Sequence, residues 1–188
     1  MRPANSMEPR LHAARSLAKV DHAAAWAALD ALFRTGTPPG ALNGRCSGEL
    51  LLLDLAPGLT QLFTALAAAW LPWRGKTFDA AGAGGDNIFT SDSRWVAELF
   101  NPLYRGFVED GPFTYRAFKF RTYLAPGRAD PDRAVLKIDY DLPENPALTI
   151  RRVLDELVQL DDDFYLGKAH VQWWWGRWQC LAFFALRA

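Results

Sequence analysis

The chain has 188 residues, with 12 Phe, 8 Trp and 5 Tyr, and its 21 basic side chains balance its 21 acidic ones. At this length about 70% of the surface of the unfolded chain is buried on folding, so a single domain can build its core without disulfides or a structural metal. The apolar fraction of 50% excludes a disordered chain. The zero net charge lacks the basic excess typical of nucleic-acid-binding proteins.

Cysteine usage and the N-terminal residues give no sign of export or metal binding. Cys46 and Cys180 lie far apart, outside any CxxC or Cys/His pattern with metal-ligand spacing. We therefore expect no metal site and a reducing, cytoplasmic location. Residues 1–20 lack the apolar core of a secretory signal. They are expected to form a flexible tail before one barrel-like domain at 21–188.

Three segments have the period of amphipathic helices. Residues 22–34 follow Asp21, a good N-cap residue, and carry apolar side chains at helical spacing. Residues 57–70 begin with Pro and repeat apolar side chains every 3.6 residues, although the apolar stretch around them is too interrupted to span a membrane. Residues 149–160 predict a third helix, before the last hairpin.

Short segments of strand type lie before and after the second of these helices. Strands are predicted at 49–55, at 75–80, at 113–124 and at 135–140, and two long strands end the chain, whereas 93–104 is ambiguous. If the strands at 113–124 and 135–140 form a hairpin, pairing Phe120 with Ile138 creates an apolar face. The opposite face then holds four charged residues: Lys119, Arg121, Lys137 and Asp139. This charged face is either solvated or a polar patch inside a barrel.

Four of the eight tryptophans lie within residues 173–178. A two-residue turn at Gly176 and Arg177 would pair Trp175 with Trp178 and would place Trp173 on the same apolar face. The other face would hold Trp174 and His170, and it would be half solvated or would line a cavity. These strands and helices predict an α+β protein with a curled or closed antiparallel sheet.

Two glycine-containing motifs imitate nucleotide-binding loops and are rejected. Gly75, Lys76 and Thr77 match the end of a P-loop, but position 70 is Trp instead of the required Gly. The glycines at 82–85 do not continue into the third glycine of a dinucleotide-binding fingerprint. His170 is the one histidine in the strand region, and a hydrogen-bonded structural histidine is favoured over a ligand or acid/base role.

Several motifs occur in an order that resembles the GxWxG-domain family of uncharacterised bacterial proteins. They are Gly44-x-Cys46-x-Gly48, Trp73-x-Gly75-Lys76-x-Phe78, the segments at 137–141 and 165–168, and the end of the chain at 183–187. The first motif is also similar to the opening strand of calycin-type barrels such as lipocalins, fatty-acid-binding proteins and nitrobindins. The resemblance implies a calycin-like β-barrel. Cys46 stands where the family has an aromatic plug, for which Trp73 is the candidate replacement.

We therefore expect the protein to bind a small hydrophobic or amphipathic molecule in an aromatic-lined pocket. The expected lining consists of six aromatic residues with two polar anchors: Trp73, Phe118, Phe120, Tyr140, Trp173 and Trp175, with Arg121 and Lys137. No cofactor is predicted.

Three alternatives remain open at this point. An enzyme could use the same pocket, with His170 or Asp139 as acid/base and Tyr140 as a hydrogen-bond donor. The resemblance to nitrobindins implies a haem protein with His170 as the ligand. An interaction module, such as a homodimer, could use Trp174 and Trp95 as an exposed patch.

Overall fold

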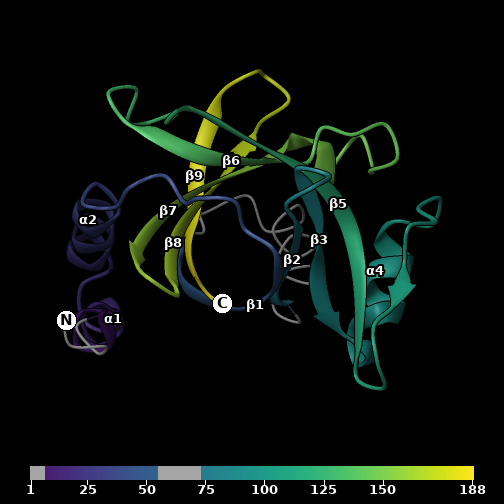
Figure 1. Ribbon diagram of the computed structural model, residues 1–188, viewed down its shortest axis with the longest axis horizontal. Coiled ribbons are helices and arrows are strands. Elements are labelled where there is room, and N and C mark those ends of the chain that lie inside the picture. The colour runs from purple at the N-terminus through teal and green to yellow at the C-terminus, as the bar shows by residue number, and fades with distance from the viewer. Residues whose placement is uncertain (1–6, 55–72) are drawn as a thin grey trace.

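The computed structural model describes residues 7–54 and 73–188 (Figure 1). Its strands form one antiparallel sheet in the order β3-β2-β1-β9-β8-β7-β6-β5-β4. Strand β3 also pairs with β5, which closes eight of the described strands into a barrel and leaves β4 outside. The predicted α+β class with a calycin-like barrel is thereby confirmed.

The elements follow one another along the chain. The strands are β1 (Gly44–Leu53), β2 (Trp73–Asp79), β3 (Gly84–Thr90), β4 (Val108–Glu109), β5 (Thr114–Pro126), β6 (Ala134–Asp139), β7 (Val153–Asp161), β8 (Phe164–Gln172) and β9 (Trp178–Arg187). The helices are α1 (Met7–Ala18), α2 (His22–Phe33) and α4 (Arg94–Phe100), with 3-10 turns η1 (Ser91–Ser93) and η2 (Ile150–Arg152).

Successive side chains of each strand alternate between the barrel interior and the outer wall. On β9, Phe184 joins the interior cluster, whereas its neighbour Phe183 lies outside under the helices. Helices α1 and α2 lie beside β7 and β8 in Figure 1 and cover this part of the outer wall. Leu29 and Phe33 of α2 pack there and are almost completely buried. The described residues therefore form two hydrophobic cores, separated by the sheet.

The N-terminal helices agree only in part with the sequence predictions. The predicted helix at 22–34 is confirmed as α2, and the Asp21 side chain accepts a hydrogen bond from the Ala24 amide as its N-cap. Residues expected to belong to a flexible tail form α1, and its Leu11 is 1% exposed. The helix predicted at 57–70 lies outside the described residues.

The helix predicted at 149–160 is wrong. Only the 3-10 turn η2 forms there, and strand β7 follows it from Val153. Apolar side chains occur on both faces of β7 because the interior and the helix-covered outer wall are both buried, so the period of two is obscured. The ambiguous segment at 93–104 contains α4, and the other predicted strands are present with shifted ends.

The register predicted for each of the two hairpins differs from the one in the structure. Ile138 pairs with Thr122 instead of Phe120, a shift of two residues that leaves every side chain on the predicted face. In the last hairpin the Trp173 amide donates to the Arg177 carbonyl, so the turn has five residues instead of two. Trp174 and Trp175 therefore lie at its exposed tip.

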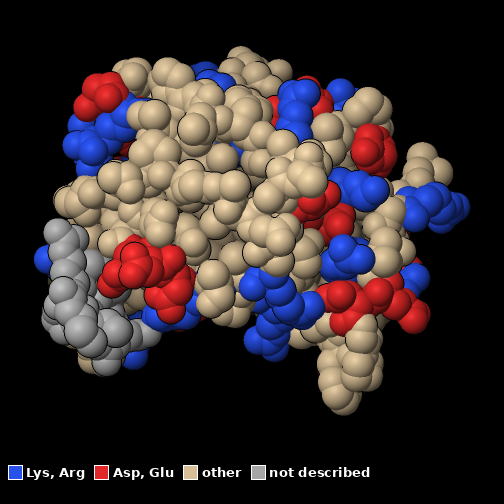
Figure 2. All heavy atoms as spheres, viewed as in Figure 1, with Lys and Arg blue, Asp and Glu red and all other residues tan. Residues whose placement is uncertain are grey.

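In Figure 2, charged side chains of both signs gather toward the edges and the lower right of the face, around a broad central area without charges. Ion pairs such as Arg45 with Asp110 and Arg121 with Asp139 join neighbouring strands and loops. Among the described residues, every helix is too short or too polar to cross a lipid bilayer.

Close contact between β1 and β2 generates a testable prediction. Gly75 has a φ of +138°, and a Cβ there would lie 2.0 Å from the Cys46 carbonyl oxygen. We expect Gly75→Ala to lower the free energy of unfolding by at least about 1–3 kcal/mol, as measured by urea denaturation. Gly40→Ala is the matched control, because nothing lies within 4 Å of a Cβ added at this position. Equal effects of the two substitutions would contradict this packing.

Candidate ligand-binding site

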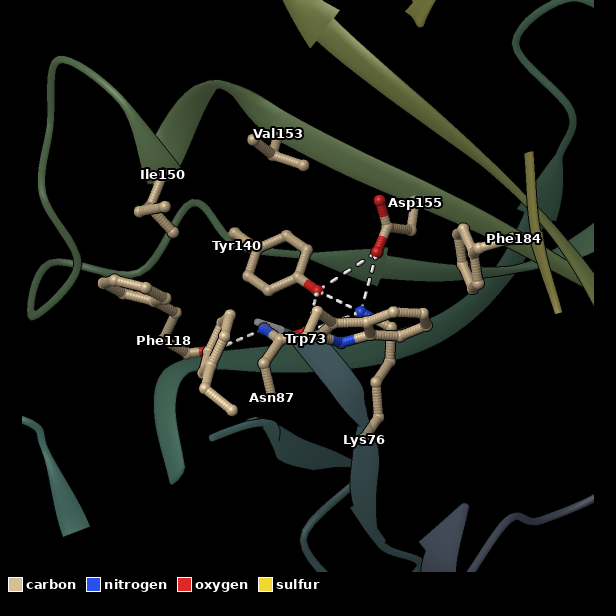
Figure 3. Close-up of a pocket in the computed structure, with 10 residues that line it drawn as sticks. Trp73, Lys76, Asn87, Phe118, Tyr140, Ile150, Val153, Asp155 and Phe184 are labelled. Atoms are coloured by element: carbon tan, nitrogen blue, oxygen red, sulfur yellow. Dashed lines mark hydrogen bonds and ion pairs between the residues drawn. The ribbon is translucent and has the colours of Figure 1, made fainter. Parts of the chain in front are cut away.

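The barrel encloses a cavity of about 40 Å³ (Figure 3). Its wall is mainly apolar, and its polar side chains contact one another in one region, which we call the polar pole. The lining residues are Trp73, Lys76, Asn87, Phe89, Phe118, Tyr140, Ile150, Val153, Asp155 and Phe184. They come from β2, β3, β5, η2, β7, β9 and the residue after β6, so barrel closure is what brings them together.

Lys76 is the centre of the polar pole. Its Nζ donates hydrogen bonds to Asp155 Oδ2 at 2.9 Å, to Asn87 Oδ1 at 2.8 Å and to the Tyr140 hydroxyl. The Tyr140 hydroxyl lies 3.1 Å from both Asp155 Oδ2 and Asn87 Oδ1 and can donate to either acceptor. We call Lys76, Asn87, Tyr140 and Asp155 the interior polar cluster; Lys76 is 2% exposed and Asp155 3%.

Aromatic rings enclose the Lys76 ammonium. Nζ lies 5.1 to 5.4 Å from the ring centroids of four residues: Trp73, Phe120, Tyr140 and Phe184. Such rings attract a cation but replace only part of its hydration. Burial accordingly lowers the pKa of Lys76, and the nearby Asp155 carboxylate opposes this shift. Burial also raises the pKa of Tyr140 well above its usual value, with Asp155 acting in the same direction.

Two features of the site are energetically costly. Asp155 Oδ1 is buried and has no hydrogen-bond partner among the described residues; in Figure 3 it points away from the dashed contacts made by Oδ2. Phe118 has a φ of +58°, a rare conformation for a residue with a Cβ. Its amide donates to the Tyr104 hydroxyl at 2.6 Å, and its carbonyl accepts from Asn87 Nδ2. Strain of this kind is concentrated at binding and active sites.

The structure brings together only some of the residues that the sequence singled out. Trp73, Phe118 and Tyr140 line the cavity, and Phe120 packs against Tyr140 with ring centroids 5.6 Å apart. A cavity at Gly48 is filled by the Trp73 ring, since a Cβ at Gly48 would lie 2.4 Å from Trp73 Cη2. The Trp73 ring thus packs directly against β1.

The other four expected lining residues lie elsewhere. Arg121 and Lys137 are on the outer wall: Arg121 pairs with Asp139 at 2.7 Å, and Lys137 pairs with Glu156. Trp175 is 55% exposed at the hairpin tip. Trp173 is buried beside η2, away from the interior polar cluster. The five-residue turn explains the position of Trp175, because it places this residue at the exposed tip of the hairpin instead of in the barrel wall.

A second buried polar group lies on the outer wall, under α2 and residues 127–133. Lys168 is 1% exposed and contacts Asp30 at 2.6 Å and Asp130 at 2.7 Å. Glu156 Oε1 accepts from Lys137 and from the Arg128 amide. His170 lies 4.0 Å from Glu156 Oε2, and neither of its ring nitrogens has a hydrogen-bond partner among the described residues.

This arrangement bears on the enzymatic and haem alternatives. Asp139 and His170 lie on the outer wall, whereas Tyr140 lines the cavity, so these three side chains do not converge. A haem bound through His170 does not fit either. The imidazole is buried next to Glu156, outside the barrel, and the cavity of about 40 Å³ is on the other side of the sheet.

Sequence reasoning missed Lys76, Asn87 and Asp155. Lys76 occurs in two motifs of the sequence, but as part of a rejected P-loop and as a strand residue without a role. A helix at 149–160 would place Asp155 off the apolar stripe, on the solvent face, so this prediction gives no sign of a buried carboxylate. Reading 153–157 as a strand would have placed Asp155 on the same face as Val153 and Leu157, which indicates a buried carboxylate.

Comparison of the chain with protein-family models, with curated proteins and with solved structures finds no match. The candidate site is therefore defined by its own geometry.

The buried ion pair predicts strong coupling between two substitutions. Lys76→Met leaves the Asp155 carboxylate buried without its cation, so we expect it to lower the free energy of unfolding by about 3–5 kcal/mol. Lys76→Met combined with Asp155→Leu removes both charges and should recover most of that loss. Urea denaturation of the single and double variants measures the coupling. Additive losses would show that the two side chains do not stabilise each other.

His170 predicts a pH dependence of stability. Burial lowers the pKa of His170, and Glu156 opposes this shift. The unfolded chain therefore takes up the proton first as the pH falls below about 6.5, so this contribution to stability is present above that pH and is lost in more acidic solution. His170→Gln should reduce the loss of unfolding free energy between about pH 7 and about pH 5. His12 and His22 remain in both proteins, so an unchanged pH profile would refute the assignment.

Proposed function

We propose that the barrel binds a small, mainly apolar molecule that carries one polar group. The observation that supports this proposal is the division of the cavity into an apolar wall and the interior polar cluster. Ligand sites in proteins commonly combine an apolar lining with a few fixed polar groups that orient the ligand. Stability alone does not explain such a cluster, because the free energy needed to remove two charges from water is about as large as the free energy gained from their attraction.

The size of the cavity restricts the ligand. A space of about 40 Å³ is well below the roughly 300–1,000 Å³ of pockets for drug-sized ligands, although it exceeds the volume that one water requires. We therefore expect a molecule of a few non-hydrogen atoms instead of a long-chain lipid.

The polar group of the ligand would meet the interior polar cluster. The Tyr140 hydroxyl can donate to an oxygen, and Asp155 Oδ1 is the acceptor without a partner among the described residues. A hydroxyl or carbonyl group can therefore be oriented at this pole while the carbon atoms lie against Phe89, Phe118 or Val153.

Kinship with the GxWxG-domain proteins remains part of this proposal. Support comes from the eight-stranded antiparallel barrel and from Cys46, which is buried in the hydrophobic core inside the barrel. The contact between Trp73 and Gly48 also supports it, since it requires a small residue at the last position of the first motif.

The proposal is tested with 1-propanol and 15N-labelled protein. The indole N–H signal of Trp73, assigned with Trp73→Phe, should shift saturably, because this group lies at the cavity and donates to Asn87 Oδ1 at 3.2 Å. The Trp175 signal should show only a small linear drift, because Trp175 is exposed at the hairpin tip. Decanoic acid should leave the Trp73 signal unchanged.

A cavity-filling substitution provides the control. Val153→Phe places a ring in the cavity and should abolish the saturable shift, whereas Val108→Phe on the exposed β4 should retain it. The proposal fails if Trp73 and Trp175 respond alike, or if the Val153→Phe protein binds as wild type does.

A further inference from the structure

We propose that Lys76 captures a small aldehyde or ketone as an imine, with Tyr140 and Asp155 moving the proton. This inference rests on the proposed function, because it names the substrate class of the same cavity. It follows from the position of one primary amine at the polar pole of an apolar cavity, within hydrogen-bond distance of a hydroxyl and a carboxylate. Lysines in apolar pockets are the amines that proteins use to form Schiff bases.

The geometry supplies what imine formation requires. Nζ of Lys76 faces the cavity in Figure 3, so a carbonyl carbon inside the cavity can approach it. The Asp155 carboxylate, 2.9 Å away, can accept a proton from Nζ and later face the iminium as its counter-ion. The Tyr140 hydroxyl contacts both groups and can donate to the carbonyl oxygen. Burial lowers the pKa of Lys76, which increases the fraction of the nucleophilic neutral amine.

The reaction balances without a further reagent. The protonated amine transfers a proton to Asp155, and the nitrogen lone pair then forms a bond to the carbonyl carbon while Tyr140 protonates the oxygen. The nitrogen of the resulting carbinolamine returns one proton to Tyr140, and Asp155 gives its proton to the carbinolamine hydroxyl. The C–O bond then breaks as the nitrogen lone pair forms the C=N bond, so water leaves and nitrogen keeps one hydrogen. The sum is ammonium plus carbonyl giving iminium plus water, so charge is conserved and nothing is oxidised or reduced.

Two other buried lysines provide an internal comparison. Lys137 is 5% exposed and Lys168 is 1% exposed, but both lie on the outer wall, where their ammonium groups are held by carboxylates, and neither belongs to the lining of the barrel cavity. Lys19 and Lys119 are exposed to solvent. Burial alone therefore predicts equal behaviour of Lys76, Lys137 and Lys168, whereas the proposed chemistry distinguishes Lys76.

Reductive trapping with propanal tests the proposal. The full chain is incubated with propanal and cyanoborohydride near pH 6, where lysines with the usual pKa of about 10.4 are almost entirely protonated. Peptide mass mapping then follows the propyl adduct at each of the five lysines and separates it from modification of the N-terminal amine. We expect the adduct to form fastest at Lys76, because the amine faces the cavity and burial lowers its pKa, which raises the fraction of neutral amine.

Lys76→Arg should lose this adduct and retain the slow background at the other lysines. If that variant does not fold, the proposal is tested by comparing the rates of adduct formation at the individual lysines of the wild-type protein. Labelling of Lys76 no faster than of Lys119, or labelling of Lys137 and Lys168 as fast as of Lys76, overturns the proposal.

The outcome is separable from that of the proposed function. 1-Propanol has the size of propanal but cannot form an imine. A saturable Trp73 shift with 1-propanol together with a slow Lys76 adduct would refute imine formation and leave the binding function intact. If the Trp73 signal also fails to respond, both proposals fall.

Discussion

A cation enclosed by a β-barrel is the constraint on which this structure depends. Lys76 is almost completely buried among aromatic rings, and its charge is balanced by Asp155, which reaches it from β7 on another part of the barrel wall. Leaving either charge alone would cost several kcal/mol, about the size of the net stability of a domain. The pair therefore favours the closed arrangement of strands that brings β2 and β7 within reach of each other.

The sheet separates this site from a second group of buried charges. Lys137, Glu156, Lys168 and His170 lie on the outer wall, where α2 and residues 127–133 exclude water. Their contacts hold the covering segments on the barrel, since Asp30 of α2 and Asp130 of the loop share the Lys168 ammonium. This group fastens the covering segments, whereas the interior polar cluster lines a cavity. One chain thus uses buried charge for two purposes, on opposite faces of the same strands.

Much of the fold follows from the sequence, but the site does not. Alternation predicted β5 and β6, and it placed Phe118 and Phe120 on the interior face, because the side-chain period of two survives a register shift of two residues. Alternation did not predict β7, because both faces of this strand are buried, and the buried position of Asp155 was therefore missed. The partners of Lys76 come from strands that are distant in sequence, and local patterns carry no information on which distant strands meet. The positions of the tryptophans in the last hairpin were wrong for another reason, because a glycine at 176 is compatible with turns of more than one length.

The defining property of the site is that the Lys76 amine faces the cavity and that burial lowers its pKa by more than the attraction of Asp155 raises it. Its most direct test is an NMR titration that follows the Cε signals of the five lysines in 13C-lysine-labelled protein, with Lys76→Arg assigning the signal. We predict that Lys76 titrates at a lower pH than the exposed Lys19 and Lys119. Titration of Lys76 together with these residues, or at a higher pH, would contradict the account, because the ion pair with Asp155 would then dominate over burial.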